Sequence, residues 1–144
     1  MTTMIRDILK SKGTMVHSVS PETSVFDALR LMEDVNVGAL LVMRDTKLVG
    51  IVSERDYARK VILKGRASAD TPVSTIMSTS VLCARPEQTI HECMGMMTAK
   101  AVRHLPVLEN KNVVGIVSIG DLVKGIIGEQ QFVIEQLENY IHGH

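Results

Sequence analysis

Gly-Ile-Val-Ser-Glu-Arg-Asp, residues 50–56, returns 65 residues later (115 minus 50) as Gly-Ile-Val-Ser-Ile-Gly-Asp, residues 115–121. Aligning residues 16–62 with residues 81–127 without a gap gives 14 identities in 47 pairs. Unrelated chains of ordinary composition would match at roughly one position in fifteen. The chain therefore contains an internal duplication, and each copy is expected to form one supersecondary unit.

Each copy of the motif predicts a buried strand that leads directly into a helix. An apolar Ile-Val pair precedes Ser-x-x-Asp, a spacing in which the serine caps a helix and the acid bonds back to the serine's backbone amide. A helix start also offers free N–H groups and a positive dipole end to a phosphate, and a nearby carboxylate suits ribose hydroxyls. The pattern alone supports the cap and a ligand site about equally.

The residues around the motif predict the order β-α-β-β-α in each copy, so we expect an α/β (α+β) fold. In the first copy the expected elements are a strand near residues 15–19, a helix capped by Thr23 or Ser24, a hairpin of residues 39–43 and 48–52, and a helix over residues 53–63. Neither half has much core of its own, so the two sheets are expected to pack as a pseudo-twofold pair.

Shorter segments flank the two copies. We expect a helix over residues 4–11 capped by Thr3, a linker at residues 64–70, a helix restarting at Thr71-Pro72, and a separate C-terminal helix over residues 129–142. The expected division of the chain is repeat one at residues 1–64, repeat two at residues 71–128 and the C-terminal helix at residues 129–144.

Composition argues against several classes of function. The 16 basic and 16 acidic side chains balance, and only four aromatic residues occur, so neither a basic field nor a stacking platform for nucleic acid is expected. No apolar run of 18 residues or signal-peptide pattern is present, which predicts a cytoplasmic protein without a membrane span. The spacings of the cysteines and histidines match no common metal site, so we expect that no metal is required.

Two features together resemble a known family. The first is the Gly-Ile-Val-Ser-x-x-Asp motif in both β-α-β-β-α copies, and the second is Arg-His-Leu-Pro-Val at residues 103–107, before the second hairpin. The chain resembles a tandem pair of cystathionine β-synthase (CBS) domains, also called a Bateman module, of the stand-alone type. The resemblance covers nearly all of residues 1–128.

The resemblance implies a module that binds an adenosyl ligand such as AMP or ATP, and one extended dinucleotide such as NAD or NADH would also fit. It implies that Asp56 and Asp121 bind ribose, while Ser53 and Ser118 meet phosphate. Charge near the phosphates would come from Arg55, Arg59 and Arg103. The base pocket implied by the family is lined by Thr14, Val16, His17, Val37, Gly38, Ala39, Val81, Cys83, Val102, His104 and Pro106.

The two pockets are expected to differ. Repeat two has Arg103 and Pro106 where repeat one has Gly38 and Leu41, and it has Gly120 and Lys124 where repeat one has Arg55 and Arg59. A ligand would then occupy the two pockets unequally, and the charge of a bound phosphate would be met by different residues in each.

The leading functional hypothesis is a nucleotide sensor that changes its shape or its grip on an unidentified partner protein in trans. The alternatives are an interaction module with empty clefts and, less favoured, an enzyme acting on a nucleotide, for which no nucleophile–base pair or Walker loop is found. A homodimer is expected, because the predicted apolar stripes are more extensive than a lone chain of this length need expose. These stripes are Ala28, Leu29 and Met32, then Cys93, Met94 and Met97, and finally residues 133–141.

Overall fold

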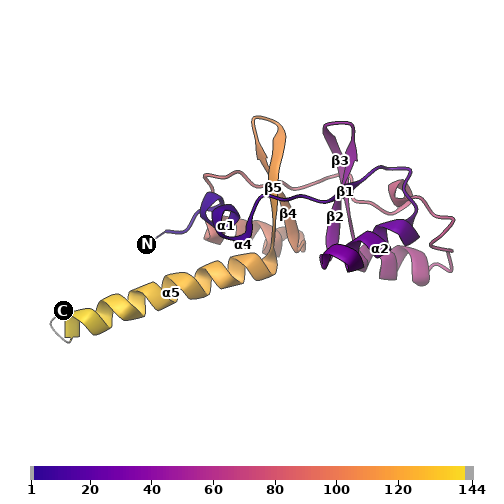
Figure 1. Cartoon of the computed structure of the whole chain (residues 1–144). Helices are drawn as coiled ribbons and strands as arrows, with labels where there is room; N and C mark the ends of the chain where they lie inside the picture. Colours follow the sequence, from indigo (N-terminus) through magenta and orange to yellow (C-terminus); the bar gives the residue numbers. More distant parts are fainter. Residues whose placement is uncertain (1, 142–144) are drawn as a thin grey trace. The chain divides into compact units, whose positions relative to one another are not determined.

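The computed structural model describes residues 2–141, and these form two compact units (Figure 1). The first-repeat unit comprises residues 16–82, and the second-repeat unit comprises residues 2–15 together with residues 83–141. The leading helix α1 (Ile5–Lys12) thus packs in the unit that contains the second hairpin. The short 3-10 helix η2 (Val73–Thr75) packs in the unit that contains the first.

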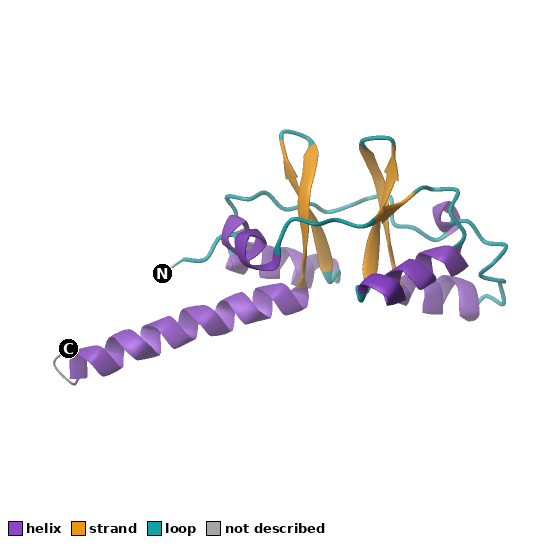
Figure 2. Ribbon diagram, in the orientation of Figure 1, coloured by secondary structure: helices purple, strands orange, loops and turns teal. Residues whose placement is uncertain are grey.

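The first-repeat unit is built on a three-stranded sheet in the order β1-β2-β3 (Figure 2). Strand β1 (Ser18–Val19) runs parallel to β2 (Ala39–Arg44), which pairs antiparallel with β3 (Lys47–Ser53). Helix α2 (Val25–Val35) buries Val25, Ala28 and Met32 against this sheet. The chain leaves β3 through α3 (Glu54–Tyr57) and the π-helical stretch η1 (Ala58–Ile62).

The second-repeat unit has the hairpin of β4 (His104–Glu109) and β5 (Asn112–Ser118). A single parallel bridge from Ala84 to Val107 stands where β1 pairs with β2 in the first repeat. Helix α4 (Ile90–Lys100) buries Ile90, Cys93 and Met97. The predicted mixed α/β fold of two repeats is confirmed.

The duplication is visible element by element. Helix α4 and strands β4 and β5 begin and end 65 residues after α2, β2 and β3, as in 90 minus 25 or 104 minus 39. Each helix has a hydroxyl N-cap, Ser24 or Thr89, and each ends at a left-handed residue, Asn36 or Ala101. The glycine that opens each motif leaves room for a side chain packed against the hairpin. A Cβ at Gly115 would lie 2.6 Å from Leu9 Cδ2, and one at Gly50 would lie 2.6 Å from Met77 Sδ.

Four predicted boundaries were wrong. The N-cap of α1 is Met4 rather than Thr3, and the strand expected near residues 15–19 is limited to Ser18–Val19. The segment after Pro72 is a 3-10 turn with Pro72 at its N-cap. No break at Gly128 separates a C-terminal helix, because α5 (Ile119–Ile141) is continuous through it. The predicted end of that helix, His142, lies outside the described residues.

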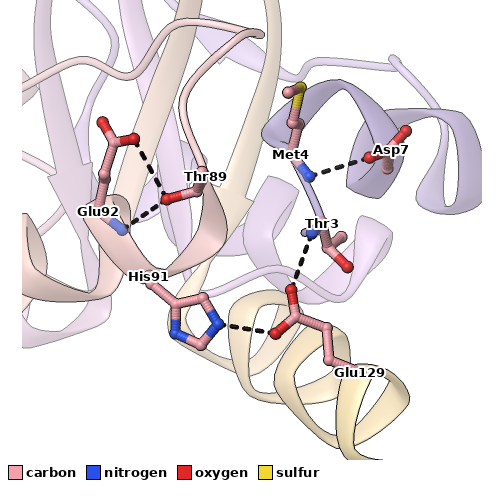
Figure 3. Close-up of polar contacts among 7 residues, drawn as sticks. All are labelled: Thr3, Met4, Asp7, Thr89, His91, Glu92 and Glu129. Carbon is pink, nitrogen blue, oxygen red and sulfur yellow. Dashed lines mark hydrogen bonds and ion pairs between the residues drawn. The ribbon is translucent and has the colours of Figure 1, made fainter. Parts of the chain in front are cut away.

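Helix α1 is bound to the rest of the second-repeat unit near its N-terminus (Figure 3). The Thr3 N–H donates to Glu129 Oε1 of α5 at 2.8 Å, and Glu129 Oε2 lies 2.7 Å from His91 Nε2 of α4. The Met4 N–H donates to Asp7 Oδ2 at 2.9 Å, which closes the first turn of α1. Glu129 therefore connects the N-terminal segment with two helices of the second repeat.

Candidate functional site

In the first repeat, the Ser-x-x-Asp motif is a capping box at the start of α3. The Ser53 N–H donates to Asp56 Oδ2 at 2.9 Å, and the Asp56 N–H donates to Ser53 Oγ at 3.2 Å. Lys60, one helical turn later, places Nζ 3.3 Å from Asp56 Oδ1. The Asp56 side chain is 17% exposed, so the carboxylate is largely sheltered and still accessible to a small ligand.

The second motif repeats this geometry at the start of α5. The Ser118 N–H donates to Asp121 Oδ2 at 2.8 Å, and the Asp121 N–H donates to Ser118 Oγ at 3.2 Å. The cation here is Lys12 of α1, whose Nζ donates to Asp121 Oδ2 at 2.6 Å and to the Ile116 carbonyl at 3.0 Å. Burial by itself would raise the pKa of Asp121, but the hydrogen bonds from Lys12 and Ser118 outweigh it and hold that pKa below its usual value.

The residues before each hairpin lie directly beside the motif. The carbonyl of Gly38 accepts the N–H of Glu54 at 3.1 Å, and the carbonyl of Arg103 accepts the N–H of Ile119 at 2.9 Å. Across the hairpins, Ala39 is paired with Ser53, and His104 is paired with Ser118. The second motif therefore has an imidazole on the neighbouring strand where the first has a methyl group.

Burial and the Lys12 ammonium together hold His104 in its neutral form. Loss of hydration is the larger cause and the nearby Lys12 charge is the next, so the pKa of His104 lies below 6.5 although Asp121 acts in the opposite direction. A neutral imidazole can both donate and accept a hydrogen bond, which suits recognition of a polar ring edge.

The other predicted pocket residues are divided between the two units. Thr14, Cys83, Val102 and Pro106 belong to the unit of Asp121, while Val16, His17, Val37 and Val81 belong to the unit of Asp56. Thr14 is exposed and Pro106 is buried, and the remaining six are partly buried. The Pro106 carbonyl accepts the Ala84 N–H at 2.8 Å, so the backbone at this position joins the first-strand segment to β4.

The three predicted phosphate arginines, Arg55, Arg59 and Arg103, are exposed. Within residues 2–141, none of their guanidinium groups takes part in an ion pair. They are free to meet an anion without first breaking a salt bridge of that part of the chain.

The first-repeat unit has a cavity of about 630 Å³ beside its motif. It contains Val37 and Gly38 from the predicted base pocket, but neither Ser53 nor Asp56 lines it. Sequence reasoning missed its other walls, because they come from two helices and a helix end. These are Leu29, Met32, Glu33, Asn36, Glu54 and Tyr57.

The sequence profile of the CBS domain matches residues 4–63 and residues 73–128. The chain belongs to the CBS-domain family. This CBS pair is 37% identical over 151 residues to the mitochondrial CBS domain-containing protein CBSX3 of Arabidopsis thaliana, covering 99% of this chain and 73% of CBSX3. It is 44% identical to the CBS domain protein NE2398, whose crystal structure superposes with a TM-score of 0.85 and covers 88% of this chain and 99% of that one.

A more distant solved structure shares the fold of the CBS pair. The CBS domain pair of protein MJ0100 is 23% identical, with a TM-score of 0.80, and the match covers 90% of this chain and 99% of that chain. That crystal structure contains 5′-methylthioadenosine and S-adenosyl-L-methionine. Among the described residues of the present chain, no helix is long and apolar enough to cross a membrane. The cytoplasmic location stays a prediction, since CBSX3 is mitochondrial.

The lowered pKa of His104 predicts a loss of stability in mild acid. The folded CBS pair binds this proton less tightly than the unfolded chain does. The free energy of unfolding therefore keeps its full value above about pH 6.5 and decreases as pH falls through the folded pKa of His104. Urea unfolding at pH 7.5 and at lower pH should show a decline of at most about 1.4 kcal/mol per pH unit from this group. The decline should be smaller in His104→Gln. Equal pH dependence in the two proteins would contradict the assignment.

Proposed function

We propose that this CBS pair is a regulatory sensor of adenine nucleotides, with one ligand site at each Ser-x-x-Asp motif. The observation that carries the proposal is the pair of sheltered carboxylates, Asp56 and Asp121, each held at a helix start by its own serine N–H. A carboxylate in this position can accept both hydroxyls of a ribose, and the helix start beside it favours a phosphate.

The ligand class is supported by the fold and by the charges near the motifs. The CBS pair of MJ0100 holds two adenosyl compounds within the same fold. Here, exposed Arg55 and Arg59 stand near the first motif and Arg103 near the second, which favours ligands that carry phosphate, such as AMP or ATP. NAD or NADH would also satisfy these groups. No metal or catalytic group is required for such a role, and the regulated partner would be a separate protein.

Asp121→Ala tests the ribose assignment. Loss of a hydrogen bond to a charged group costs about 1.5–3 kcal/mol, so AMP affinity at one site should fall about 10- to 150-fold in titration calorimetry. Ser24→Ala is the matched control, because it removes the cap on Asp27 N–H of α2 and should cost about 1 kcal/mol of stability without changing affinity. Unchanged AMP affinity in Asp121→Ala would contradict the assignment of Asp121 to ribose.

We also propose that the sensor is a homodimer joined through the C-terminal half of α5. On the predicted stripes of α2 and α4, Ala28, Met32, Cys93 and Met97 are buried within their own units, and only Leu29 and Met94 are partly exposed. The apolar side chains of α5 are different: Figure 1 shows this half of the helix running beyond α1 and α4. From Ile127 onward, the exposed apolar residues of α5 are Ile127, Phe132, Val133, Ile134, Leu137, Tyr140 and Ile141.

The spacing of these residues suits a second copy of the same helix. Ile127, Ile134 and Ile141 recur at intervals of seven, and their side chains are 59%, 48% and 75% exposed. A seven-residue repeat keeps one apolar seam facing a partner helix, and burying each such side chain contributes about 1.5–3 kcal/mol. A twofold-symmetric pair of these helices would bury the apolar seam of both chains at once.

Light scattering at micromolar concentration tests this interface. The wild-type chain should have the mass of two chains, and Ile134→Asp with Leu137→Asp should halve it, because two charges would be desolvated in the seam. Gln136→Glu adds a charge at another exposed position of the same helix and should leave the dimer intact. A wild-type mass of one chain would rule out the dimer.

A further inference from the structure

The two motifs take their lysines from different elements. In the first repeat, Lys60 belongs to the helical segment that follows the motif, and its Nζ lies 3.3 Å from Asp56 Oδ1. The corresponding residue in the second repeat (60 plus 65) is Gly125, which has no cation to offer. Lys12 of α1 takes this role, although it lies 109 residues from Asp121 along the chain.

Gly125 allows Lys12 to take the place of a local lysine, because this glycine lies where α1 and α4 meet α5. A Cβ at Gly125 would come 3.0 Å from Ile8 Cδ1 and 3.1 Å from Ile90 Cδ1. A side chain there would be tight against both helices, so Ile8 and Ile90 would have to give way by a few tenths of an ångström. Glycine at position 125 therefore removes the local lysine and also leaves room for α1 to pack beside α5.

The two lysines also contact different oxygens of their carboxylates. Lys60 lies against Oδ1 of Asp56, while Oδ2 is occupied by the N–H and hydroxyl of Ser53. Lys12 shares Oδ2 of Asp121 with the Ser118 N–H. The lysine and the serine N–H therefore contact different carboxylate oxygens in the first motif and the same oxygen in the second.

Lys12 has a donor left for a ligand. A lysine ammonium has three N–H groups, and those of Lys12 serve Asp121 Oδ2 and the Ile116 carbonyl. The side chain is 35% exposed, so the third N–H can reach a bound anion. The ammonium thus contacts the carboxylate at the N-terminus of α5 while its side chain remains partly exposed.

We propose that Lys12 is a specificity-determining residue of the second-repeat ligand site, which fixes Asp121 for a ribose diol and pairs with the phosphate of a nucleoside monophosphate. The inference rests on the proposed function and assigns a residue outside both repeat motifs to that site. It predicts that the second site binds AMP more tightly than adenosine, because Lys12 of the N-terminal helix α1 pairs with the phosphate.

NMR titration of the full chain with AMP and with adenosine tests the proposal, because the Ser118 amide reports occupancy of the second motif. In Lys12→Met, AMP affinity should fall about 10-fold or more, the effect of a lost charge-assisted hydrogen bond, while adenosine affinity should change less than about 3-fold. Lys12→Arg should retain most of the preference for AMP. Lys10→Met, which removes an exposed charge from the same helix, should behave like the wild type.

The remaining outcomes separate this inference from the proposed function. If the wild type binds no AMP, both fail. If the wild type binds AMP and Lys12→Met loses AMP and adenosine affinity equally, Lys12 only braces Asp121 and the phosphate pairing is wrong; tighter AMP binding would show that Lys12 competes with the ligand. Continued docking of α1 in Lys12→Met is checked through the Thr3 amide, whose hydrogen bond to Glu129 of α5 does not involve Lys12.

Discussion

The hydrogen bond from the motif serine N–H to the aspartate Oδ2 is the contact on which the site geometry depends. It measures 2.9 Å in the first repeat and 2.8 Å in the second. It joins the last residue of a hairpin strand to the first turn of a helix, so one contact sets the direction of the helix and the position of the carboxylate. A helix cap contributes only about 1 kcal/mol, which is small beside the buried core. Its main effect is therefore to fix the positions of the helix and the carboxylate, and its contribution to stability is minor.

The two repeats are alike up to this contact and differ after it. The first continues into a four-residue helix and a π-helical stretch, and its motif lysine is local. The second continues into a 23-residue helix, whose carboxylates Asp121 and Glu129 are bound by Lys12 and by the Thr3 N–H near the two ends of α1. The second site consequently depends on α1 remaining docked, and the first does not.

Much of this arrangement could be predicted from local patterns. The motif repeated at 65 residues, the apolar spacing of α2 and α4, and the hairpins all depend on contacts between near neighbours, and these predictions were confirmed. The same reasoning failed for α5, because a separate helix was predicted to begin at residue 129, whereas α5 runs unbroken through Gly120, Gly125 and Gly128. Each glycine costs a helix about 1 kcal/mol, but packing against Ile8 and Ile90 at Gly125 favours the continuous helix. The Lys12–Asp121 pair could not be predicted, because nothing near Lys12 in the sequence indicates a contact 109 residues away.

The most direct test of the central claim is a crystal structure of the chain grown with AMP. The account predicts that the ribose hydroxyls lie within hydrogen-bonding distance of the Asp121 carboxylate, with the phosphate toward the N-terminus of α5, and that any second AMP occupies Asp56 in the same way. An AMP molecule bound elsewhere, such as in the cavity beside Tyr57, with both motif carboxylates untouched, would contradict it.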